Sequence, residues 1–388
     1  MKKICVFTGT RAEYGLLKPL MDEIKKDKAL KLKVIASGMH LSAEFGLTFR
    51  EIEKDGFSID KKVEMLLSSD TSLGILKSTR IGIIGISKAL NQIKPDITII
   101  LGDRFEALAC AIASAVLRIP NAHIHGGELS EGVYDDAFRH SITKMSHLHF
   151  TSTEEYKRRV VQLGEDPGRV FNVGALGIDN IKNLKLLSKK EIEKENGFKF
   201  NKRNLLVTFH PVTLEKNSSK EQVQNLLKVL DELKDTNIIF TKANADIDGR
   251  IINKMIDEYV ANNRQKAGAF VSMGQLKYLS TMKHVDAVVG NSSSGIIESP
   301  SFKIGVINIG DRQRGRIKAE NIIDCRPEKE SIRKAFRKLY SSEFKRILQN
   351  VANPYGNGGS AKKILKVLKT YDLNNILKKS FFDIDFVL

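Results

Sequence analysis

The stretch that decides the fold runs from Asp96 to Lys144 and reads DITIILGDRFEALACAIASAVLRIPNAHIHGGELSEGVYDDAFRHSITK. Two short apolar runs in it, Ile97 to Leu101 and Ala122 to Ile124, have the length and the β-branched content of buried strands. The segment between them, Arg104 to Leu117, is rich in alanine and leucine, which favours a packed helix. A strand, a helix and a second strand within about 30 residues form a βαβ unit, so we expect the two strands to be parallel neighbours.

Polar residues begin where each of these strands ends. Asp103 follows the first strand, and the sequence His125-Gly126-Gly127-Glu128 follows the second. Because parallel sheets bind ligands outside the carboxyl ends of their strands, we expect a reaction site at this edge. Asp135 comes soon afterwards in the chain and is expected to share a pocket with Asp103 and Glu128. Carboxyl groups held close together have split pKa values, so one can act as base and another as acid.

Composition sets the broad class. A chain of 388 residues with 41% hydrophobic residues is too long for one ordinary core, so two α/β domains are expected. The longest nearly unbroken apolar run, Ala107 to Leu117, is shorter than the roughly 20 residues of a membrane span, so no membrane association is expected. No apolar leader precedes the first strand, and Cys5, Cys110 and Cys325 form no CxxC pair. These features favour a cytoplasmic protein with reduced thiols.

The formal net charge of +17 raises the question of a nucleic-acid partner. The lysines are scattered over the sequence, and no RRM, KH, zinc-finger or basic-region pattern accompanies them. We therefore expect no nucleic-acid binding. A lysine-rich solvated surface, or an anionic small molecule as ligand, accounts for the charge.

Strands and helices alternate in both halves of the chain, which predicts two doubly wound, Rossmann-like α/β domains facing across a cleft. The first is expected at 1–175 with the catalytic acids, the second at 176–365 with the nucleotide site, and a tail at 366–388 is expected to pack back on the first domain. Further strands are predicted at 3–8, 33–37, 148–152, 170–173, 205–209, 238–241, 269–272, 287–289 and 305–309. Further helices are predicted at 42–54, 71–93, 153–163, 220–233, 249–260, 275–283 and 360–370.

The turn after the first strand, Gly9 to Gly15, can bring backbone N–H groups to an anion at a helix start. It lacks the GxGxxG pattern, which disfavours a nicotinamide site, and no cofactor is expected. Arg11 in this turn either holds a phosphate or pairs with Glu13 on the surface. His40, just past the next strand, is expected to be a structural hydrogen bonder.

The second half carries a serine-rich turn, Gly290-Asn291-Ser292-Ser293-Ser294-Gly295, between a strand and a helix. Hydroxyls and free backbone donors at a helix start suit a pyrophosphate, although a serine cap alone is the plainer alternative. Glu298, one turn on, is a candidate for the ribose hydroxyls. His210 precedes a proline at another strand end and is a candidate acid or base. The loop from Gly310 to Arg316 brings three arginines to a strand end and suits a diphosphate.

Two histidines on one strand face, His123 and His125, form a possible metal pair. No cysteine cluster supports a metal site, so no metal is expected.

The motifs together resemble a known family. GTRAEYG, GMHLS, LGDRFEALA, HIHGGE, DDAFRHSITKMSHLHFTSTEEY, FHPVT, GNSSSGIIE and INIGDRQRGR are similar to the hydrolysing UDP-N-acetylglucosamine 2-epimerases, over residues 3 to about 360. The resemblance implies a two-domain GT-B fold, a UDP-sugar substrate and a homodimer or homotetramer. It also implies an elimination of UDP followed by hydration, which yields N-acetylmannosamine for sialic acid synthesis without a cofactor.

Residue by residue, Asp103 and Asp135 match the family's catalytic carboxylates and His210 its active-site histidine. Either Glu128 or His125 is expected to transfer the other proton, because some relatives have a glutamate at the position of His125. The residues expected to bind substrate or nucleotide are Arg11, Arg104, Asn244, Ser292, Ser293, Ser294, Gly295, Glu298 and Arg316.

Two alternatives stay open at this point. The same reaction can act on a nucleotide-linked 2,4-diacetamido-2,4,6-trideoxyhexose, as in legionaminic acid pathways, because the sugars differ only in local pocket contacts. A GT-B glycosyltransferase or a non-catalytic nucleotide-sugar sensor would share the fold and the UDP site. The acids at 103, 128 and 135 favour the epimerase over both.

Overall fold

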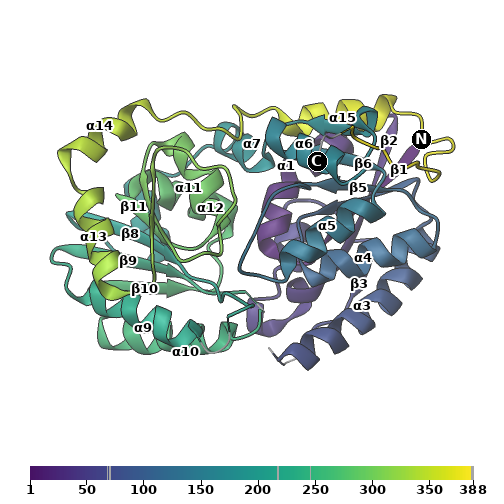
Figure 1. Ribbon diagram of the computed structural model, residues 1–388. Helices are drawn as coiled ribbons and strands as arrows, with labels where there is room; N and C mark the ends of the chain where they lie inside the picture. Colours follow the sequence, from purple (N-terminus) through teal and green to yellow (C-terminus); the bar gives the residue numbers. More distant parts are fainter. Residues whose placement is uncertain (68, 70, 216–217, 245, 386–388) are drawn as a thin grey trace. The chain divides into compact units, whose positions relative to one another are not determined.

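The computed structural model describes residues 1–67, 69, 71–215, 218–244 and 246–385, and Figure 1 shows the course of the chain. The chain divides into two compact units. Unit 1 comprises Met1–Glu128, Asp135–Lys182 and Tyr355–Leu388, and unit 2 comprises Leu129–Tyr134 and Asn183–Pro354. The units differ from the expected domains in three respects: unit 1 continues to Lys182, the chain returns to unit 1 already at Tyr355, and a six-residue segment after Glu128 belongs to unit 2.

Unit 1 contains a seven-stranded parallel sheet in the order β3-β2-β1-β4-β5-β6-β7. Its strands are β1 (Lys2–Thr8), β2 (Leu30–Ser37), β3 (Lys61–Val63), β4 (Ile97–Leu101), β5 (Asn121–Ile124), β6 (Leu148–Thr151) and β7 (Val170–Asn172). The predicted βαβ unit is confirmed, because β4 and β5 are parallel neighbours joined by α4 (Phe105–Val116).

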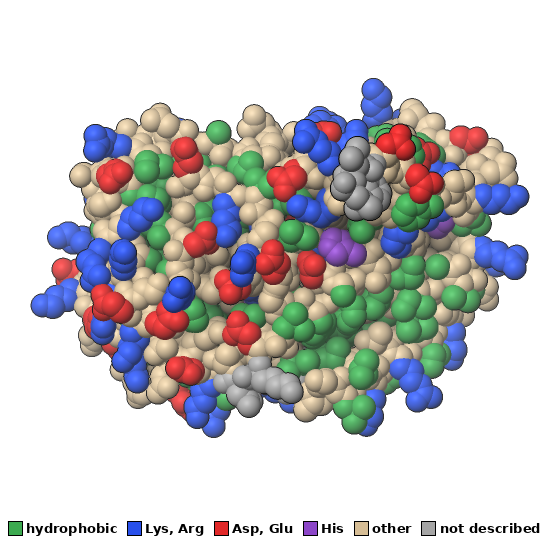
Figure 2. All heavy atoms as spheres, viewed as in Figure 1, with side chains coloured by type: hydrophobic (Ala, Val, Ile, Leu, Met, Phe, Trp, Pro, Cys, Tyr) green, Lys and Arg blue, Asp and Glu red, His purple; other side chains and the backbone are tan. Residues whose placement is uncertain are grey.

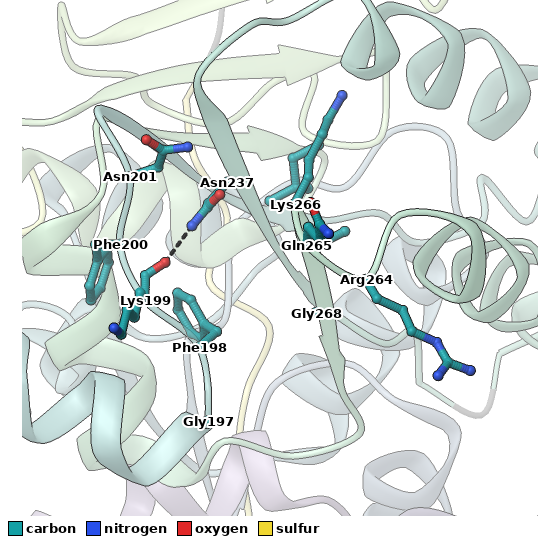
Figure 3. Close-up of a pocket in the computed structure, with 12 residues that line it drawn as sticks. Gly197, Phe198, Lys199, Phe200, Asn201, Asn237, Arg264, Gln265, Lys266 and Gly268 are labelled. Carbon is teal, nitrogen blue, oxygen red and sulfur yellow. Dashed lines mark hydrogen bonds between the residues drawn. The ribbon is translucent and has the colours of Figure 1, made fainter.

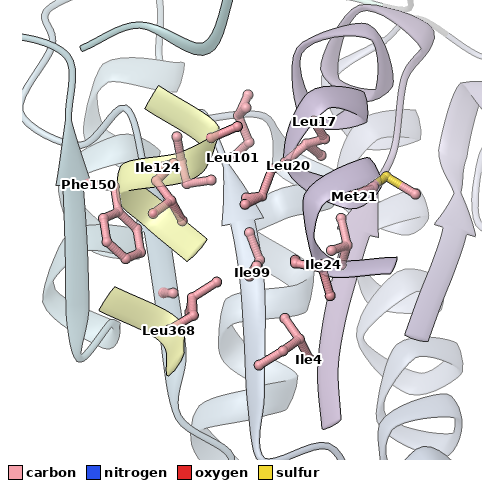
Figure 4. Packing of buried hydrophobic residues seen from close by; sticks show 14 of the residues in the cluster. Ile4, Leu17, Leu20, Met21, Ile24, Ile99, Leu101, Ile124, Phe150 and Leu368 are labelled. Carbon is pink, nitrogen blue, oxygen red and sulfur yellow. The ribbon is translucent and has the colours of Figure 1, made fainter. Parts of the chain in front are cut away.

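Helices cover both faces of this sheet, and alternate residues of β1 point to opposite faces, as the strand period requires. Ile4 and Val6 belong to a cluster of buried side chains with Leu17 and Leu20 of α1 (Arg11–Lys26) and Leu368 of α15 (Ser360–Thr370), part of which Figure 4 shows. The other helices of this unit are α2 (Phe49–Lys54), α3 (Ser72–Ile93), α5 (Asp135–Met145), α6 (Glu154–Gln162) and α7 (Leu176–Asn183), with short 3₁₀ turns η1 (Gly38–Leu41), η2 (Ala43–Phe45) and η3 (Pro167–Arg169).

Unit 2 contains a six-stranded parallel sheet in the order β10-β9-β8-β11-β12-β13. Its strands are β8 (Arg203–Thr208), β9 (Thr236–Thr241), β10 (Ala267–Phe270), β11 (Ala287–Gly290), β12 (Gly305–Ile309) and β13 (Ile322–Cys325). Its helices are α8 (Lys189–Asn196), α9 (Ser218–Asp231), α10 (Gly249–Asn262), α11 (Gly274–His284), α12 (Ser293–Ile297), η4 (Ser299–Phe302), α13 (Lys329–Leu339) and α14 (Ser342–Asn350).

The core of unit 2 also lies on both faces of its sheet. Leu205 and Val207 of β8 pack with helices α9, α10 and α13 on one face, while Leu206 packs with Met282 of α11 on the other. Each unit is therefore a doubly wound, Rossmann-like α/β sheet, and the two together make a fold of the GT-B type, as expected.

Each sheet has one point where the order of its strands reverses: between β1 and β4 in unit 1, and between β8 and β11 in unit 2. In open parallel sheets, ligands bind outside the carboxyl ends of the strands at this point. The turn after β1, Asp103 after β4, His210 after β8 and the serine-rich turn after β11 all follow these four strands.

Some predicted elements were wrong in detail. Residues 42–54 do not form one helix, because Gly46 and Leu47 take left-handed backbone conformations between η2 and α2. The short strands β3 and β13 were missed, since three or four residues give too little periodicity. Within the described residues, no helix is both long and apolar enough to cross a bilayer.

Candidate functional site

Asp103 lies just beyond β4 and contacts Arg139 of α5. The guanidinium of Arg139 donates from Nη2 to the Asp103 carboxylate and from Nη1 to the carbonyl oxygen of His125, at 2.9 Å. Arg139 is buried, whereas the Asp103 side chain keeps 20% of its surface exposed. A single buried cation therefore joins the ends of β4 and β5 and leaves a carboxylate accessible at the edge of the sheet.

The residues after β5 form a tight turn. His125 adopts a left-handed backbone conformation with φ of 66°, which is uncommon for a residue with a side chain. Gly127 also has positive φ, and a Cβ atom there would lie 2.4 Å from the carbonyl oxygen of Tyr156. The turn brings Glu128 back to His125, with 3.5 Å between Oε1 and Nδ1, and Ser152 Oγ donates to the same Oε1 at 2.8 Å.

Asp135 is the first residue of α5 and precedes Arg139 by one helical turn. Its neighbour Asp136 pairs instead with His140, with 3.5 Å between Oδ2 and Nε2. All three predicted acids therefore belong to segments that follow β4 and β5, and Arg139 connects the Asp103 carboxylate with the His125–Glu128 turn.

His123 is a structural residue. Its Nε2 contacts the carbonyl oxygen of Gly102 at 2.7 Å and its Nδ1 contacts Thr143 Oγ1 at 3.0 Å, so both ring nitrogens are already used. Burial lowers the pKa of His123 to about 3. The considered metal pair of His123 and His125 is therefore not available, and the described residues contain no group of three His, Cys, Asp or Glu side chains that could hold a metal ion. His40, as expected, is a buried hydrogen bonder between Thr8 and Thr48.

Arg11 begins α1, directly after the turn that follows β1. Glu13, which was considered as its surface partner, is buried instead, and its Oε2 accepts a hydrogen bond from the N–H of Gly9 at 2.8 Å. Burial and the neighbouring Glu106 charge raise the pKa of Glu13, which favours the protonated form of this carboxyl group. The sequence signal was available, because Thr10 accepts from the Glu13 N–H in a cap of the Thr-x-x-Glu type.

Arg104 lies at the start of α4, directly after Asp103. Its Nε donates to Glu106 Oε2 at 3.1 Å, and the Arg104 side chain is only 12% exposed. Glu106 is fully buried beneath Gly9 and Gly38, where a Cβ atom would come within about 3 Å of the Glu106 side chain. Arg104 therefore stabilises a buried carboxylate under the turn that carries Arg11.

In unit 2, the serine-rich turn depends on Gly290. This glycine has φ of 129°, and a Cβ atom there would lie 1.9 Å from the carbonyl oxygen of Thr208, so no other residue fits. Ser292 caps α12 and accepts from the Ser294 N–H at 3.4 Å. Gly295 lies within α12 and lets the helix pack on β11 and β12. The cap alternative is thus confirmed for Ser292, and it leaves the predicted nucleotide role untested.

Glu298 ends α12 and is buried, with 6% of its surface exposed. Burial raises the pKa of Glu298 to about 7. This carboxyl group therefore loses its proton near neutral pH. A ligand hydroxyl that donates a hydrogen bond to the carboxylate would favour the ionised form.

His210 and Asn291 join the ends of β8 and β11. The Asn291 side-chain amide accepts from the His210 N–H at 2.7 Å and donates to the His210 carbonyl oxygen at 2.8 Å. The carbonyl oxygen of Asn291 in turn accepts from Arg312 at 3.1 Å and from Gln313 at 2.8 Å. Sequence reasoning did not assign a role to Asn291 or Gln313.

The three arginines of the loop after β12 differ in their surroundings. Arg314 is exposed and pairs with Glu131 at 3.3 Å, whereas Arg316 is buried and donates from Nη2 to Ser130 Oγ at 3.3 Å. Both partners come from the segment Leu129–Tyr134, which explains why this segment belongs to unit 2. Asn244 lies in the loop after β9, where its carbonyl oxygen approaches Gly249 at the start of α10.

A groove of about 380 Å³ lies away from these residues, at the amino-terminal ends of β9 and β10. Figure 3 shows that its basic side chains, Lys199, Arg264 and Lys266, point away from one another. They do not converge on one anion, and the groove contributes nothing to the predicted site.

Comparisons with known proteins decide the family. The profile of the UDP-N-acetylglucosamine 2-epimerase family matches residues 22–369. The chain belongs to this family. A hydrolysing GDP/UDP-N,N'-diacetylbacillosamine 2-epimerase from Campylobacter jejuni is 49% identical over 384 residues, which cover 99% of each chain. A hydrolysing UDP-N,N'-diacetylbacillosamine 2-epimerase from Legionella pneumophila is 33% identical over 98% of this chain and 99% of its own.

Solved structures of this family share the fold. The UDP-N-acetylglucosamine 2-epimerase from Neisseria meningitidis, crystallised with UDP-N-acetylglucosamine, superimposes with a TM-score of 0.77 at 20% identity, over 95% of this chain and 100% of that one. The resemblance to the hydrolysing 2-epimerases and the GT-B fold are thereby confirmed. The chain is a nucleotide-sugar 2-epimerase, while the roles of its individual residues remain predictions.

Proposed function

We propose that this 2-epimerase hydrolyses a nucleotide-linked N,N'-diacetylbacillosamine, a 2,4-diacetamido-2,4,6-trideoxyhexose, to the free 2-epimer and nucleoside diphosphate. The observation that carries the proposal is the 49% identity, over nearly the whole of both chains, to a relative named for this substrate. A second relative named for the UDP-linked sugar supports the same choice. Of the two substrates that the sequence left open, this one is therefore the first candidate.

The proposed reaction has two steps that need two proton-transfer groups. In the first, a base takes the proton from C2 while the C1–O bond breaks and the nucleoside diphosphate leaves, which gives a glycal. In the second, water adds at C1 and an acid delivers a proton to C2 from the opposite face. The C2 hydrogen is weakly acidic, so the bond to the diphosphate breaks ahead of proton removal and positive charge develops at C1.

The side chains of unit 1 suit the proton chemistry. Asp103 has an accessible carboxylate beside a buried arginine, and the His125–Glu128 pair follows the neighbouring strand. We assign Asp103 to stabilising the charge that develops at C1, and Asp135 to the return of the proton at C2. Carboxylates are suited to both roles.

The side chains of unit 2 suit the nucleotide. We assign Ser292, Ser293 and Arg316 to the diphosphate and Glu298 to the ribose hydroxyls, and we assign Arg11 of unit 1 to the diphosphate as well. His210, whose main chain is fixed by Asn291, is assigned to the leaving diphosphate oxygen. Hydroxyl, amide and guanidinium groups are the usual partners of phosphate oxygens. Ser294, Gly295 and Asn244 are the other residues of unit 2 in the predicted binding set, and Arg104 of unit 1 belongs to it as well.

UDP-N-acetylglucosamine is the second candidate substrate. The family description names this nucleotide sugar, and a solved relative of the same fold was crystallised with it. The product would then be N-acetylmannosamine, the precursor of sialic acid. The two sugars differ at C4 and C6, which do not take part in the reaction.

The test is a panel of four substrates, the UDP and GDP forms of each sugar, followed by proton NMR. Release of nucleoside diphosphate together with the 2-epimer of one sugar identifies the substrate. An acceptor-dependent glycoside would support a glycosyltransferase instead, and binding without turnover would support a nucleotide-sugar sensor. Either result contradicts the proposal.

We also propose that the enzyme is a homo-oligomer, a dimer or a tetramer. Large apolar side chains are exposed on α3 and at the end of α4, namely Leu73, Leu76, Ile81, Ile84 and Val116. Figure 2 shows hydrophobic side chains gathered over this part of unit 1. Contiguous exposed apolar surface is typical of association sites, and a second copy of the chain fits because closed symmetric pairing covers such a face on both copies. Light scattering of the wild type and of Leu76→Lys tests this assignment.

A cytoplasmic location is proposed as well. Cys5 and Cys110 are buried free thiols that show no pairing in the described structure. Fractionation of the source cells tests the location.

A further inference from the structure

The turn after β5 holds an imidazole and a carboxylate that are both buried, with 6% of the His125 side chain and 1% of the Glu128 side chain exposed. Glu128 Oε1 accepts the Ser152 hydroxyl at 2.8 Å while facing His125 Nδ1 at 3.5 Å. The carboxylate is therefore held between the Ser152 hydroxyl and the imidazole. Because Nδ1 faces Glu128, the opposite ring nitrogen, Nε2, points away from it.

The backbone around His125 is also constrained. Its left-handed conformation is costly for a residue with a side chain, and such strain persists where the surroundings enforce it, often at functional sites. Arg139 enforces it here, because its guanidinium donates to the His125 carbonyl at 2.9 Å and also to the Asp103 carboxylate. The main chain of His125 is thereby tied to the accessible acid at the end of the neighbouring strand β4.

Resting on the proposed function, we infer that His125 is the catalytic base that takes the C2 proton and that Glu128 is its positioning residue. The imidazole Nε2 accepts the proton as the electron pair of the C2–H bond forms the C1=C2 double bond and the C1–O bond electrons leave with the diphosphate. The imidazolium that results lies against the Glu128 carboxylate, which stabilises its charge. The imidazolium returns its proton to solvent after the product has left the site.

Charge considerations favour this division of roles. A neutral imidazole is a stronger base than a carboxylate, by about two pKa units in unperturbed groups, and the C2 hydrogen is only weakly acidic. A buried carboxylate that orients an imidazole and stabilises its cation is an arrangement used by other enzymes. Glu128 fits that supporting role, because its Oε1 already accepts the Ser152 hydroxyl and faces the imidazole.

The neighbours of His125 limit what else can titrate there. Glu128 and Arg139 face it directly, Asp103 reaches it through Arg139, and His123 precedes it on the same strand. Burial lowers the pKa of His123 to about 3, so His123 stays neutral across the working range. Glu298 of unit 2, whose pKa burial raises to about 7, also changes its charge in this range, so a limb of the pH profile is assigned to His125 only where it moves in the His125 variants.

The deciding experiment measures kcat against pH for the wild type, His125→Gln and His125→Glu. We expect His125→Gln to lower kcat by at least 100-fold, while affinity for the nucleoside diphosphate stays within about threefold. We expect His125→Glu to recover part of the rate and to move the acid limb of the profile down by about two pH units, because a carboxylate then titrates in place of the imidazole. A merely structural role of His125 would not move this limb.

Two further variants separate the roles. Glu128→Gln is expected to lower kcat with little change in KM and to shift the acid limb to lower pH, because the imidazolium loses its counter-charge. His284→Gln is the matched control, since that histidine belongs to unit 2, whereas His125 belongs to unit 1, and contacts the carbonyl oxygen of Leu187. The inference is overturned if His125→Gln keeps the wild-type rate, or if its glutamate variant is active with an unmoved limb. An inactive wild type on all four substrates would contradict the proposed function instead.

Discussion

The side-chain amide of Asn291 holds the main chain of His210 at both of its polar groups. Oδ1 accepts the His210 N–H at 2.7 Å and Nδ2 donates to the His210 carbonyl at 2.8 Å. Because Asn291 directly follows β11 and His210 lies just beyond β8, this pair fixes the two central strand ends of unit 2 relative to each other. The position of the His210 imidazole thus depends on a residue 81 positions away.

Asn291→Ala should therefore affect both stability and activity. The substitution leaves a buried N–H and a buried carbonyl without partners, which costs about 2 to 4 kcal/mol of unfolding free energy. Urea unfolding measures that loss, and kcat should fall as His210 loses its fixed backbone. Asn308→Ala is the matched control, because Asn308 is a buried asparagine that donates to Asp324 on the neighbouring strand. Equal kcat losses in both variants would contradict a specific role of Asn291.

Asp103→Asn and Asp135→Asn should each lower kcat by about 100- to 10,000-fold, because each removes a charge or a proton that the reaction needs. Affinity for UDP should change little, since neither side chain is assigned to the nucleotide. Steady-state rates and calorimetric titration with UDP provide the two measurements. Wild-type turnover in both variants would remove the carboxylates from the mechanism.

Ser292→Ala and Ser293→Ala should weaken UDP binding first. Each hydroxyl that contacts a phosphate oxygen contributes about 1 kcal/mol, so each variant should bind UDP about 5- to 10-fold more weakly. For Ser292, the loss of its cap on α12 adds a small destabilisation that thermal unfolding measures separately. Calorimetry with UDP checks the prediction, and unchanged affinity in both variants would contradict the nucleotide assignment.

The sequence predicted features that depend on local pattern. The β4–α4–β5 unit followed from strand-length apolar runs around an alanine-rich helix, and the acids at the strand ends followed from the same pattern. Partnerships between distant residues could not be predicted in this way. The Asn291–His210 contact joins two strands, and the capture of Leu129–Tyr134 by unit 2 depends on pairs with Arg314 and Arg316.

Charged residues were the hardest to place. Glu13 was considered as a surface partner of Arg11, yet it is buried and accepts a backbone hydrogen bond, and Arg104, predicted to bind substrate, pairs with the buried Glu106. The Glu106 side chain packs against the backbones of Gly9 and Gly38, where a Cβ atom would lie within about 3 Å of it. This packing is visible only in the folded chain. The left-handed backbone of His125 was hidden for a similar reason, because Arg139 holds it from another helix.

Glu298 should make nucleotide binding depend on pH. Burial raises its pKa to about 7, and ribose hydroxyls donate stronger hydrogen bonds to its ionised form than to its protonated form. UDP affinity should therefore rise as the pH increases from about 6 to 8, and binding should release a proton in this range. The terminal phosphate of UDP titrates near pH 6 and adds its own slope. In Glu298→Gln, only the phosphate contributes to the dependence of UDP affinity on pH. The difference between the wild type and this variant therefore measures the contribution of Glu298. Identical slopes would contradict the ribose assignment.

The buried carboxylate of Glu165 connects the C-terminal segment to unit 1. It contacts His149 Nε2 at 2.9 Å and accepts from Lys144 Nζ at 2.6 Å and from Lys379 Nζ at 2.8 Å. Burial by itself would raise the pKa of Glu165, but these hydrogen bonds outweigh it and lower the pKa to about 2. Its folded pKa is thus below the ordinary value of 4.5, so the stabilisation is present above about pH 4.5 and is lost as the pH falls toward 2.

Lys379→Ala should consequently weaken the attachment of the C-terminal segment. We expect a loss on the order of 1 to 3 kcal/mol at pH 7, because one of the cations around a buried carboxylate is removed. The loss should shrink between about pH 4.5 and pH 2 as Glu165 takes up a proton. Lys378→Ala is the matched control, since the Lys378 side chain is exposed. Urea unfolding of both variants at pH 7 and pH 3 gives the comparison, and equal stabilities of the two variants at pH 7 would show that the Glu165 contact does not stabilise the segment.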